Sequence, residues 1–131
     1  MESISLIIAS VITSLILYQS VFIAPSVNKL LQKDEAGILL RHIWPKFFII
    51  IGLLSFVSFL IELFKLETFY KYLSLTSFLF MMICYFITPS INKAKDNLKE
   101  QLWFILHLAT VFITLITLIL NVIIIYYKIS S

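Results

Sequence analysis

Four long apolar runs, separated by short polar stretches, dominate the chain. They cover about residues 4–24, 47–64, 72–88 and 102–127, and Glu62 is the only charged residue within them. A helix needs roughly 20 mostly apolar residues to cross a bilayer, whereas membrane barrels are built from short alternating segments. The pattern therefore predicts an all-α membrane protein with four transmembrane helices in one domain.

Within each run, small and polar residues recur at steps of three and four, which places them on one helix face. In the fourth run this face carries His107, Thr110, Thr114, Thr117 and Asn121. The matching faces are Ser10, Thr13, Leu17, Ser20 and Ala24 in the first run, Pro45, Phe48, Gly52, Ser55, Phe59 and Glu62 in the second, and Ser74, Ser77, Met81, Cys84 and Thr88 in the third. Such residues gather at helix interfaces in membranes, and a 3.5-residue period is typical of left-handed packing. We expect a left-handed four-helix bundle with these faces inside.

The polar face of the fourth run has two interpretations. Its hydroxyls can bond carbonyls one turn back, in which case the face serves helix packing. Alternatively the face lines a hydrated path or a polar pocket, which His107 and Asn121 favour because polar side chains at membrane depth are costly. Glu62 lies two residues from the end of its run, so we expect its carboxylate to extend toward water rather than to relay protons.

The clearest pattern is an internal repeat. Residues 22–29 (FIAPSVNK) recur as residues 86–93 (FITPSINK), identical at six of eight positions and offset by 64. A histidine follows each proline, His42 in the first half and His107 in the second. Because the first and third runs cross in the same direction, the halves, about 1–64 and 65–131, are expected to be parallel two-helix repeats related by an axis along the membrane normal.

The repeated motif has a mechanical interpretation. Its shared polar and proline positions are Pro25, Ser26 and Asn28 in the first copy and Pro89, Ser90 and Asn92 in the second. Proline kinks or ends a helix, and neighbouring serine and asparagine side chains can bond the backbone groups that it frees. We interpret the motif as a helix exit used twice; the alternative is a functional pair of gating kinks or a ligand rim.

Composition and charge support the membrane interpretation and orient the chain. The chain is 61% hydrophobic and 13% charged, against about 45–50% and 25% in soluble domains. The two long connections after the first and third runs hold seven of the ten basic residues, namely Lys29, Lys33, Arg41, Lys46, Lys93, Lys95 and Lys99, whereas the opposite side holds Lys65, Lys71 and Lys128. The positive-inside rule then predicts two basic cytoplasmic loops and both termini outside, in a bacterial inner (plasma) membrane. No basic face with aromatic readers suggests nucleic-acid binding.

Two hypotheses about function follow from the candidate chemistry. The sequence has no nucleophile–base arrangement and no glycine-rich phosphate loop, so we expect a non-enzymatic transport or interaction component, working as a homo-oligomer or in a larger membrane complex. A purely structural subunit of such a complex fits the same composition. The rival is a haem- or metal-binding redox protein that uses His42 and His107. Because neither histidine has a companion at metal-ligand spacing, no cofactor is expected, with haem as the alternative.

The sequence also resembles a known family. Residues 36–48 (AGILLRHIWPKFF) are similar to the entry into the second span in the uncharacterised membrane family that includes transmembrane protein 205. Residues 22–28 and Thr88–Pro89 resemble its exits from spans one and three, and Leu106–His107 with Thr110 resembles its entry into span four. Leu108 and Thr114 depart from a glycine and an asparagine of that family. The resemblance implies four spans and membrane residence, without a settled activity.

Overall fold

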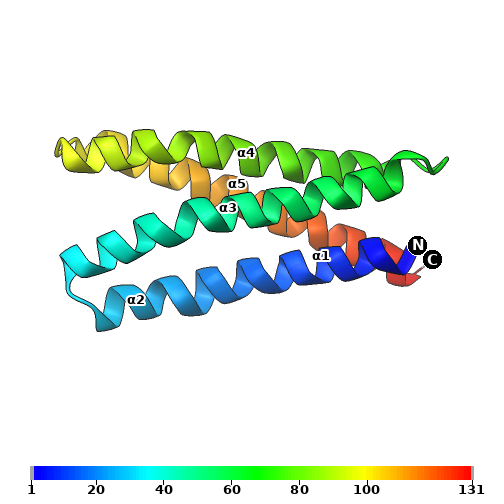
Figure 1. The fold of residues 1–131 in the computed structure, drawn as a ribbon, viewed down its shortest axis with the longest axis horizontal. Helices are drawn as coiled ribbons and strands as arrows, with labels where there is room; N and C mark the ends of the chain where they lie inside the picture. Colours follow the sequence, from blue (N-terminus) through cyan, green and yellow to red (C-terminus); the bar gives the residue numbers. More distant parts are fainter. Residues whose placement is uncertain (1, 131) are drawn as a thin grey trace.

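The computed structural model describes residues 2–130, which fold almost entirely into helices. These are α1 (Glu2–Leu17), a π-helical segment η1 (Tyr18–Ile23), α2 (Ala24–Leu30), α3 (Lys33–Leu63), α4 (Phe69–Asp96) and α5 (Glu100–Ser130). The first three follow one another without a break, so the fold consists of four long rods (Figure 1). All four rods are long and apolar enough to cross a membrane. The prediction of an all-α membrane bundle of four helices is confirmed.

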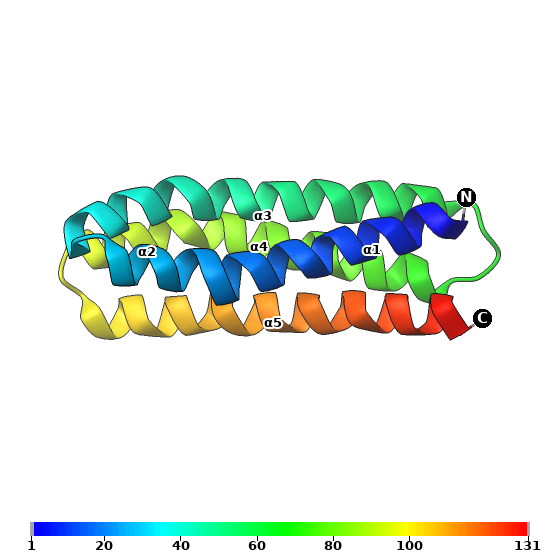
Figure 2. The same cartoon turned by 90° about the horizontal axis from the view of Figure 1, so that it is seen from below.

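The rods form an antiparallel ring. The most extensive packing joins α3 to α4 and α4 to α5, and α1 closes the ring against α5 and α3. The two rods that run in the same direction, α1 and α4, lie across the bundle from each other, as do α3 and α5 (Figures 1 and 2). The two termini lie at the same end. This arrangement is compatible with two parallel two-helix repeats, but any up-and-down ring of four helices shares it, so the repeat symmetry stays a prediction, as does the left-handed twist.

Branched and aromatic side chains fill the space between the rods. Ile12, Ile51 and Met81 are fully buried, and Phe47 and Phe48 pack with them on the inner side of α3. Gly52 lies where α3 meets α4, because a Cβ at this position would be in van der Waals contact with Met81 Cβ at 3.5 Å and would displace the flexible end of Met82, whose Cε would be 2.6 Å away. The joint between the two halves of the chain is therefore tightly packed.

The prediction of two long polar connections, after the first and third apolar runs, is wrong. α3 already begins at Lys33, and α4 continues to Asp96, so only short turns join the rods at this end. Asp34 and Glu35 occupy the first turn of α3 and Lys93 and Lys95 the last turn of α4, where each charge complements the helix dipole. These polar residues therefore extend the helices beyond the apolar runs.

The two copies of the repeated motif have different backbones. In the first, the Ala24 N–H donates to the Gln19 carbonyl in a π-type bond, and Pro25 then stands in the first turn of α2. In the second, Pro89 lies inside α4, which continues without interruption. The expected helix exit after Pro89 is therefore wrong. Membrane helices tolerate an internal proline when neighbouring helices support them, and α4 packs between α3 and α5.

Candidate functional site

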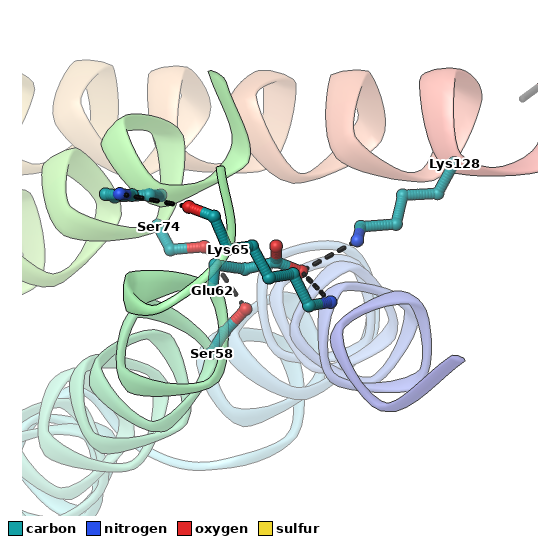
Figure 3. Close-up of polar contacts among 6 residues, drawn as sticks. Ser58, Glu62, Lys65, Ser74 and Lys128 are labelled. Atoms are coloured by element: carbon teal, nitrogen blue, oxygen red, sulfur yellow. Dashed lines mark hydrogen bonds and ion pairs between the residues drawn. The ribbon is translucent and has the colours of Figure 1, made fainter. Parts of the chain in front are cut away.

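A buried carboxylate lies at the end of the bundle that holds both termini (Figure 3). Glu62, in the last turn of α3, is only 1% exposed. Its Oε1 accepts hydrogen bonds from Lys128 Nζ of α5 at 2.7 Å and from Lys65 Nζ at 3.3 Å. The expectation that Glu62 extends toward water is wrong, because its position on α3 faces the interior and two ammonium groups reach it there.

Further polar contacts lie near this carboxylate at the same end of the bundle. Lys128 Nζ also lies 4.3 Å from the ring centroid of Tyr70, a favourable cation–π position. Lys71 Nζ donates to the Leu63 carbonyl at 3.1 Å, which closes the α3–α4 turn. One turn along α3 from Glu62, the Ser58 and Ser74 hydroxyls are 3.1 Å apart. We call Glu62, Lys65 and Lys128 the charged cluster.

The charged cluster leaves part of its hydrogen-bonding capacity unused. The Ser5 hydroxyl of α1 lies beside the Glu62 carboxylate and is close enough to interact with it, although neither Ser5 Oγ nor Glu62 Oε2 reaches full hydrogen-bond geometry with a described residue. Both atoms are shielded from outside. A buried carboxylate oxygen and a hydroxyl in this state can each still bond a small polar guest.

The predicted polar faces of the second half lie inside the bundle. In α5, Thr110, Thr114, Thr117 and Asn121 are at most 7% exposed, and His107 is half-buried. Three of these side chains are bonded locally or across to α4. Thr110 Oγ1 donates to the His107 carbonyl at 2.8 Å and Thr117 Oγ1 to the Ile113 carbonyl at 3.0 Å, and Asn121 Nδ2 donates to the Thr117 carbonyl at 2.8 Å and to Ser77 Oγ at 3.3 Å. In α4, Ser77 and Thr88 bond carbonyls one turn back. This half behaves as a packing interface.

The first half treats its interior polar groups differently. The buried side-chain atoms that lack partners among the described residues are Ser5 Oγ, Thr13 Oγ1, Gln19 Nε2, Ser55 Oγ and Glu62 Oε2. All five belong to α1, η1 or α3. From Ser5 to Gln19 they extend over about 21 Å at the helical rise of 1.5 Å per residue. We call these five atoms the unpaired row.

Sequence reasoning missed Ser5 and Gln19 because the predicted inner face of the first helix is largely wrong, although Thr13 Oγ1 on that face is buried. Leu17 is 46% exposed, whereas Ser5 and Gln19 are buried with Ile12. Ser10 is only partly buried, since its hydroxyl donates to the Leu6 carbonyl at 2.8 Å and does not need a neighbouring helix. The Gln19 amide cannot fill its hydrogen bonds within its own helix so easily. The seven-residue spacing of Ser5, Ile12 and Gln19 is therefore the signal that could have shown which face is buried.

The two histidines are not brought together. His42 is exposed on α3, with its Nδ1 3.5 Å from Lys46 Nζ. His107 stacks on Trp103 of α5, with ring centroids 5.1 Å apart. The helices α3 and α5 are diagonal partners that do not pack directly. Across residues 2–130, no group of three or more His, Cys, Asp or Glu side chains is arranged to hold a metal ion.

The polar side chains of the repeated motif also differ from expectation. In the described part of the chain, the side chains of Ser26, Asn28, Ser90 and Asn92 make no hydrogen bond to the backbone groups freed by proline. Instead, the second copy offers a backbone carbonyl: Arg41 of α3 donates to the Asn92 oxygen at 3.4 Å and pairs with Asp96 at 2.6 Å. These contacts are solvent-exposed, so they contribute little stability.

Comparison with known proteins places the chain in a family. Residues 7–100 match the model of a domain of unknown function, DUF4149. This range takes in nearly all of α1 through α4, whereas α5, which supplies Lys128, lies beyond it. No curated protein and no solved structure matches the chain. With four helices able to span a membrane and a family match over most of its length, the chain is an integral membrane protein that belongs to the DUF4149 family, a domain of unknown function.

Proposed function

We propose that this protein is a small non-enzymatic transport component that moves a small hydrophilic solute or ion along the interior of its first half. The unpaired row carries the proposal. A buried polar group without a partner costs about 1–3 kcal/mol, and a serine can avoid that cost by bonding its own helix, as Ser10 does. Unpaired interior groups are what a passing solute or water molecule requires.

The charged cluster supports the same function. Ionisable residues inside a membrane bundle often mark the paths of substrates and ions. Glu62 places such a group at one end of the unpaired row, where Ser5 is its neighbour. Lys128 compensates the charge within the bundle. Because Glu62 Oε1 is bonded and Oε2 is not, the carboxylate can bind a passing solute through Oε2 while the lysines still compensate its charge.

Transport requires more than one chain. A single bundle is closely filled, with Ile12, Ile51 and Met81 fully buried along its centre, and four helices enclose little volume. We therefore propose that the unpaired row becomes a path only when a homo-oligomer, or a larger membrane complex, holds the rods of the first half apart. The distribution of lysines favours a topology in which both termini lie outside a bacterial inner membrane. An alkaline phosphatase fused to the C-terminus should then be active, and an inactive fusion would indicate the opposite orientation.

The competing functions have less support. A purely structural or interaction subunit gains nothing from unpaired buried polar atoms, since apolar replacements of similar size would be equally or more stable. No observation favours a haem or metal site on His42 and His107, because their helices are diagonal. The resemblance to the transmembrane protein 205 family supports membrane residence and adds no activity of its own.

Cysteine accessibility tests whether the unpaired row is hydrated. In a Cys84→Ala background, single cysteines at Thr13 and Ser55 represent the row, and cysteines at Ser14 and Val57 represent exposed faces of the same helices. A small, membrane-impermeant methanethiosulfonate reagent should modify the interior cysteines at least about tenfold faster, because lipid-facing thiols do not ionise. Equal, slow reaction at all four positions would indicate a dry interior and favour a structural subunit.

A flux assay connects hydration to transport. In proteoliposomes, uptake of protons, chloride and urea is measured for the wild type, for Glu62→Gln and for the matched control Glu67→Gln, whose residue is exposed in the α3–α4 turn. We expect uptake of at least one probe above that of empty liposomes, with loss in Glu62→Gln and retention in Glu67→Gln. If no probe enters faster than in empty liposomes, the interaction role replaces transport.

A further inference from the structure

At the end of the bundle opposite the charged cluster, a groove of about 500 Å³ opens between the ends of the helices. Its walls come from the start of α3, the end of α4 and the start of α5. The side chains that matter are Lys33, Lys95, Gln101, Trp103 and Phe104. We call this the basic groove.

The two lysines of the basic groove keep their charge available. Neither Lys33 nor Lys95 forms an ion pair or a hydrogen bond with another described residue, whereas nearby Arg41 is held by Asp96. Lys95 Nζ instead lies 4.3 Å from the centroid of the Trp103 ring, which orients its ammonium group without neutralising it. Glu100 also lines the groove but bridges neither lysine, so the lining carries a net positive charge.

The position of the basic groove along the bundle matches the membrane interface. Trp103 stands at the start of the fourth apolar run, the level at which tryptophan is enriched in membrane proteins. It is held in place by its parallel stack on His107. Phe104, the next residue of α5, is 54% exposed and gives the groove an apolar wall. A lipid could therefore place a headgroup in the groove and its chains against α5.

We propose that the basic groove binds the phosphate group of an anionic membrane phospholipid. Basic pockets between transmembrane helices are suited to such headgroups because the ammonium groups attract the phosphate and the membrane supplies the ligand at high local concentration. Lys33 and Lys95 contact the phosphate oxygens, and the Gln101 amide is placed to bond the polar headgroup. This binding does not depend on whether the bundle transports a solute.

Native mass spectrometry of the detergent-purified protein tests the proposal with phosphatidylglycerol and phosphatidylcholine as probes. The wild type should retain phosphatidylglycerol preferentially, and Lys33→Gln/Lys95→Gln should reduce this preference by about tenfold, because each lysine near an anionic headgroup strengthens binding several-fold. The matched control is Lys93→Gln/Lys99→Gln, which removes the same charge from exposed positions outside the groove. Circular dichroism checks that both variants keep their helices.

Three results would overturn the proposal. The first is a wild type without preference for the anionic lipid. The second is an equal loss in both double variants, which would assign the preference to the overall charge of this end. The third is complete displacement of lipid by millimolar inorganic phosphate, which would make the basic groove a site for small anions.

A spectroscopic measurement locates the lipid independently. In Trp44→Phe, Trp103 is the remaining tryptophan. Brominated phosphatidylglycerol should then quench its fluorescence more strongly than brominated phosphatidylcholine does, and the difference should vanish in Lys33→Gln/Lys95→Gln. Equal quenching by the two lipids would place the anionic lipid elsewhere and contradict the proposal.

Discussion

The two halves of this protein share a motif and a topology but differ inside. In the half formed by α4 and α5, the buried polar groups of Ser77, Thr117 and Asn121 bond carbonyls one turn back or one another. In the half formed by α1 to α3, Ser55 and Gln19 bury polar atoms that have no partner in the described chain. The second half therefore resembles a scaffold, and the first resembles a place where something polar is accommodated.

The backbone shows the same contrast. Nearly identical octapeptides give a π-helical segment before Pro25 and an uninterrupted α-helix through Pro89. The difference lies in their neighbours: α4 is held between α3 and α5, whereas the backbone of η1 makes no close approach to the other described rods. A helix without lateral support can widen where a proline clashes with the preceding turn. Gln19 is the second residue of this π segment, and its carbonyl accepts the π-type bond from Ala24, which links the irregular backbone to the unpaired row.

The largest expected effect is at the ion pair that joins the two halves. Lys128→Met should lower the free energy of unfolding by about 3 kcal/mol, because it leaves Glu62 buried with only its weaker partner. Glu62→Leu/Lys128→Met should recover most of that loss. Reversible unfolding in mixed detergent micelles, followed by circular dichroism, measures both. If the double variant were as unstable as the single one, the attraction between Glu62 and Lys128 would exceed the cost of burying their two charges.

A smaller effect is expected where the halves pack most closely. Gly52→Leu should destabilise the bundle by about 2 kcal/mol, because the added side chain meets Met82 and Met81. Gly37→Leu, at a position where a Cβ meets nothing within 4 Å, is the matched control and should be neutral or stabilising. The same unfolding assay compares them, and equal destabilisation by the two variants would contradict the close approach of α3 and α4.

The difference in polar satisfaction can be measured directly. Asn121→Leu should cost about 1 kcal/mol, because it removes the bonds to Ser77 and the Thr117 carbonyl. Ser55→Ala should cost nothing or be stabilising, because its hydroxyl is unpaired. Thermal unfolding of the two variants side by side gives the comparison. If Ser55→Ala were the more damaging change, the two halves would not differ as described.

The smallest effect is expected at the repeated proline. Pro89→Ala should stabilise the protein by up to about 1 kcal/mol, because α4 can regain one backbone hydrogen bond. Pro25→Ala should change stability by less, since a proline in the first turn of a helix gives up no hydrogen bond. The shift in unfolding temperature measures both. A larger shift at Pro25 would mean that the proline itself maintains η1.

The accuracy of sequence reasoning differed between α1 and the other three rods for a physical reason, since the predicted face of α3, with Phe48, Ser55 and Glu62, is buried as well. In α5 the polar residues form a single face and stand out from an otherwise apolar helix, and in α4 most of them do, so the buried faces could be predicted. In α1 the hydroxyls occur on more than one face, and Ser10 and Ser14 satisfy theirs within the helix. The position of Glu62 near the end of its apolar run also suggested that its carboxylate reaches water. The ion pair that buries it could not be predicted locally, because Lys128 comes 66 residues later in the chain.

The sequence by itself determined that lipid surrounds most of this protein, and hence that the backbone forms four long helices whose hydrogen bonds are closed internally. Apolar length and period carry that information locally. Only the tertiary structure decided which face of α1 is buried, that Glu62 is enclosed by Lys65 and Lys128, and that one copy of the motif widens into a π-helix. These outcomes depend on which side chains a neighbouring helix brings within bonding distance, and no local pattern encodes that.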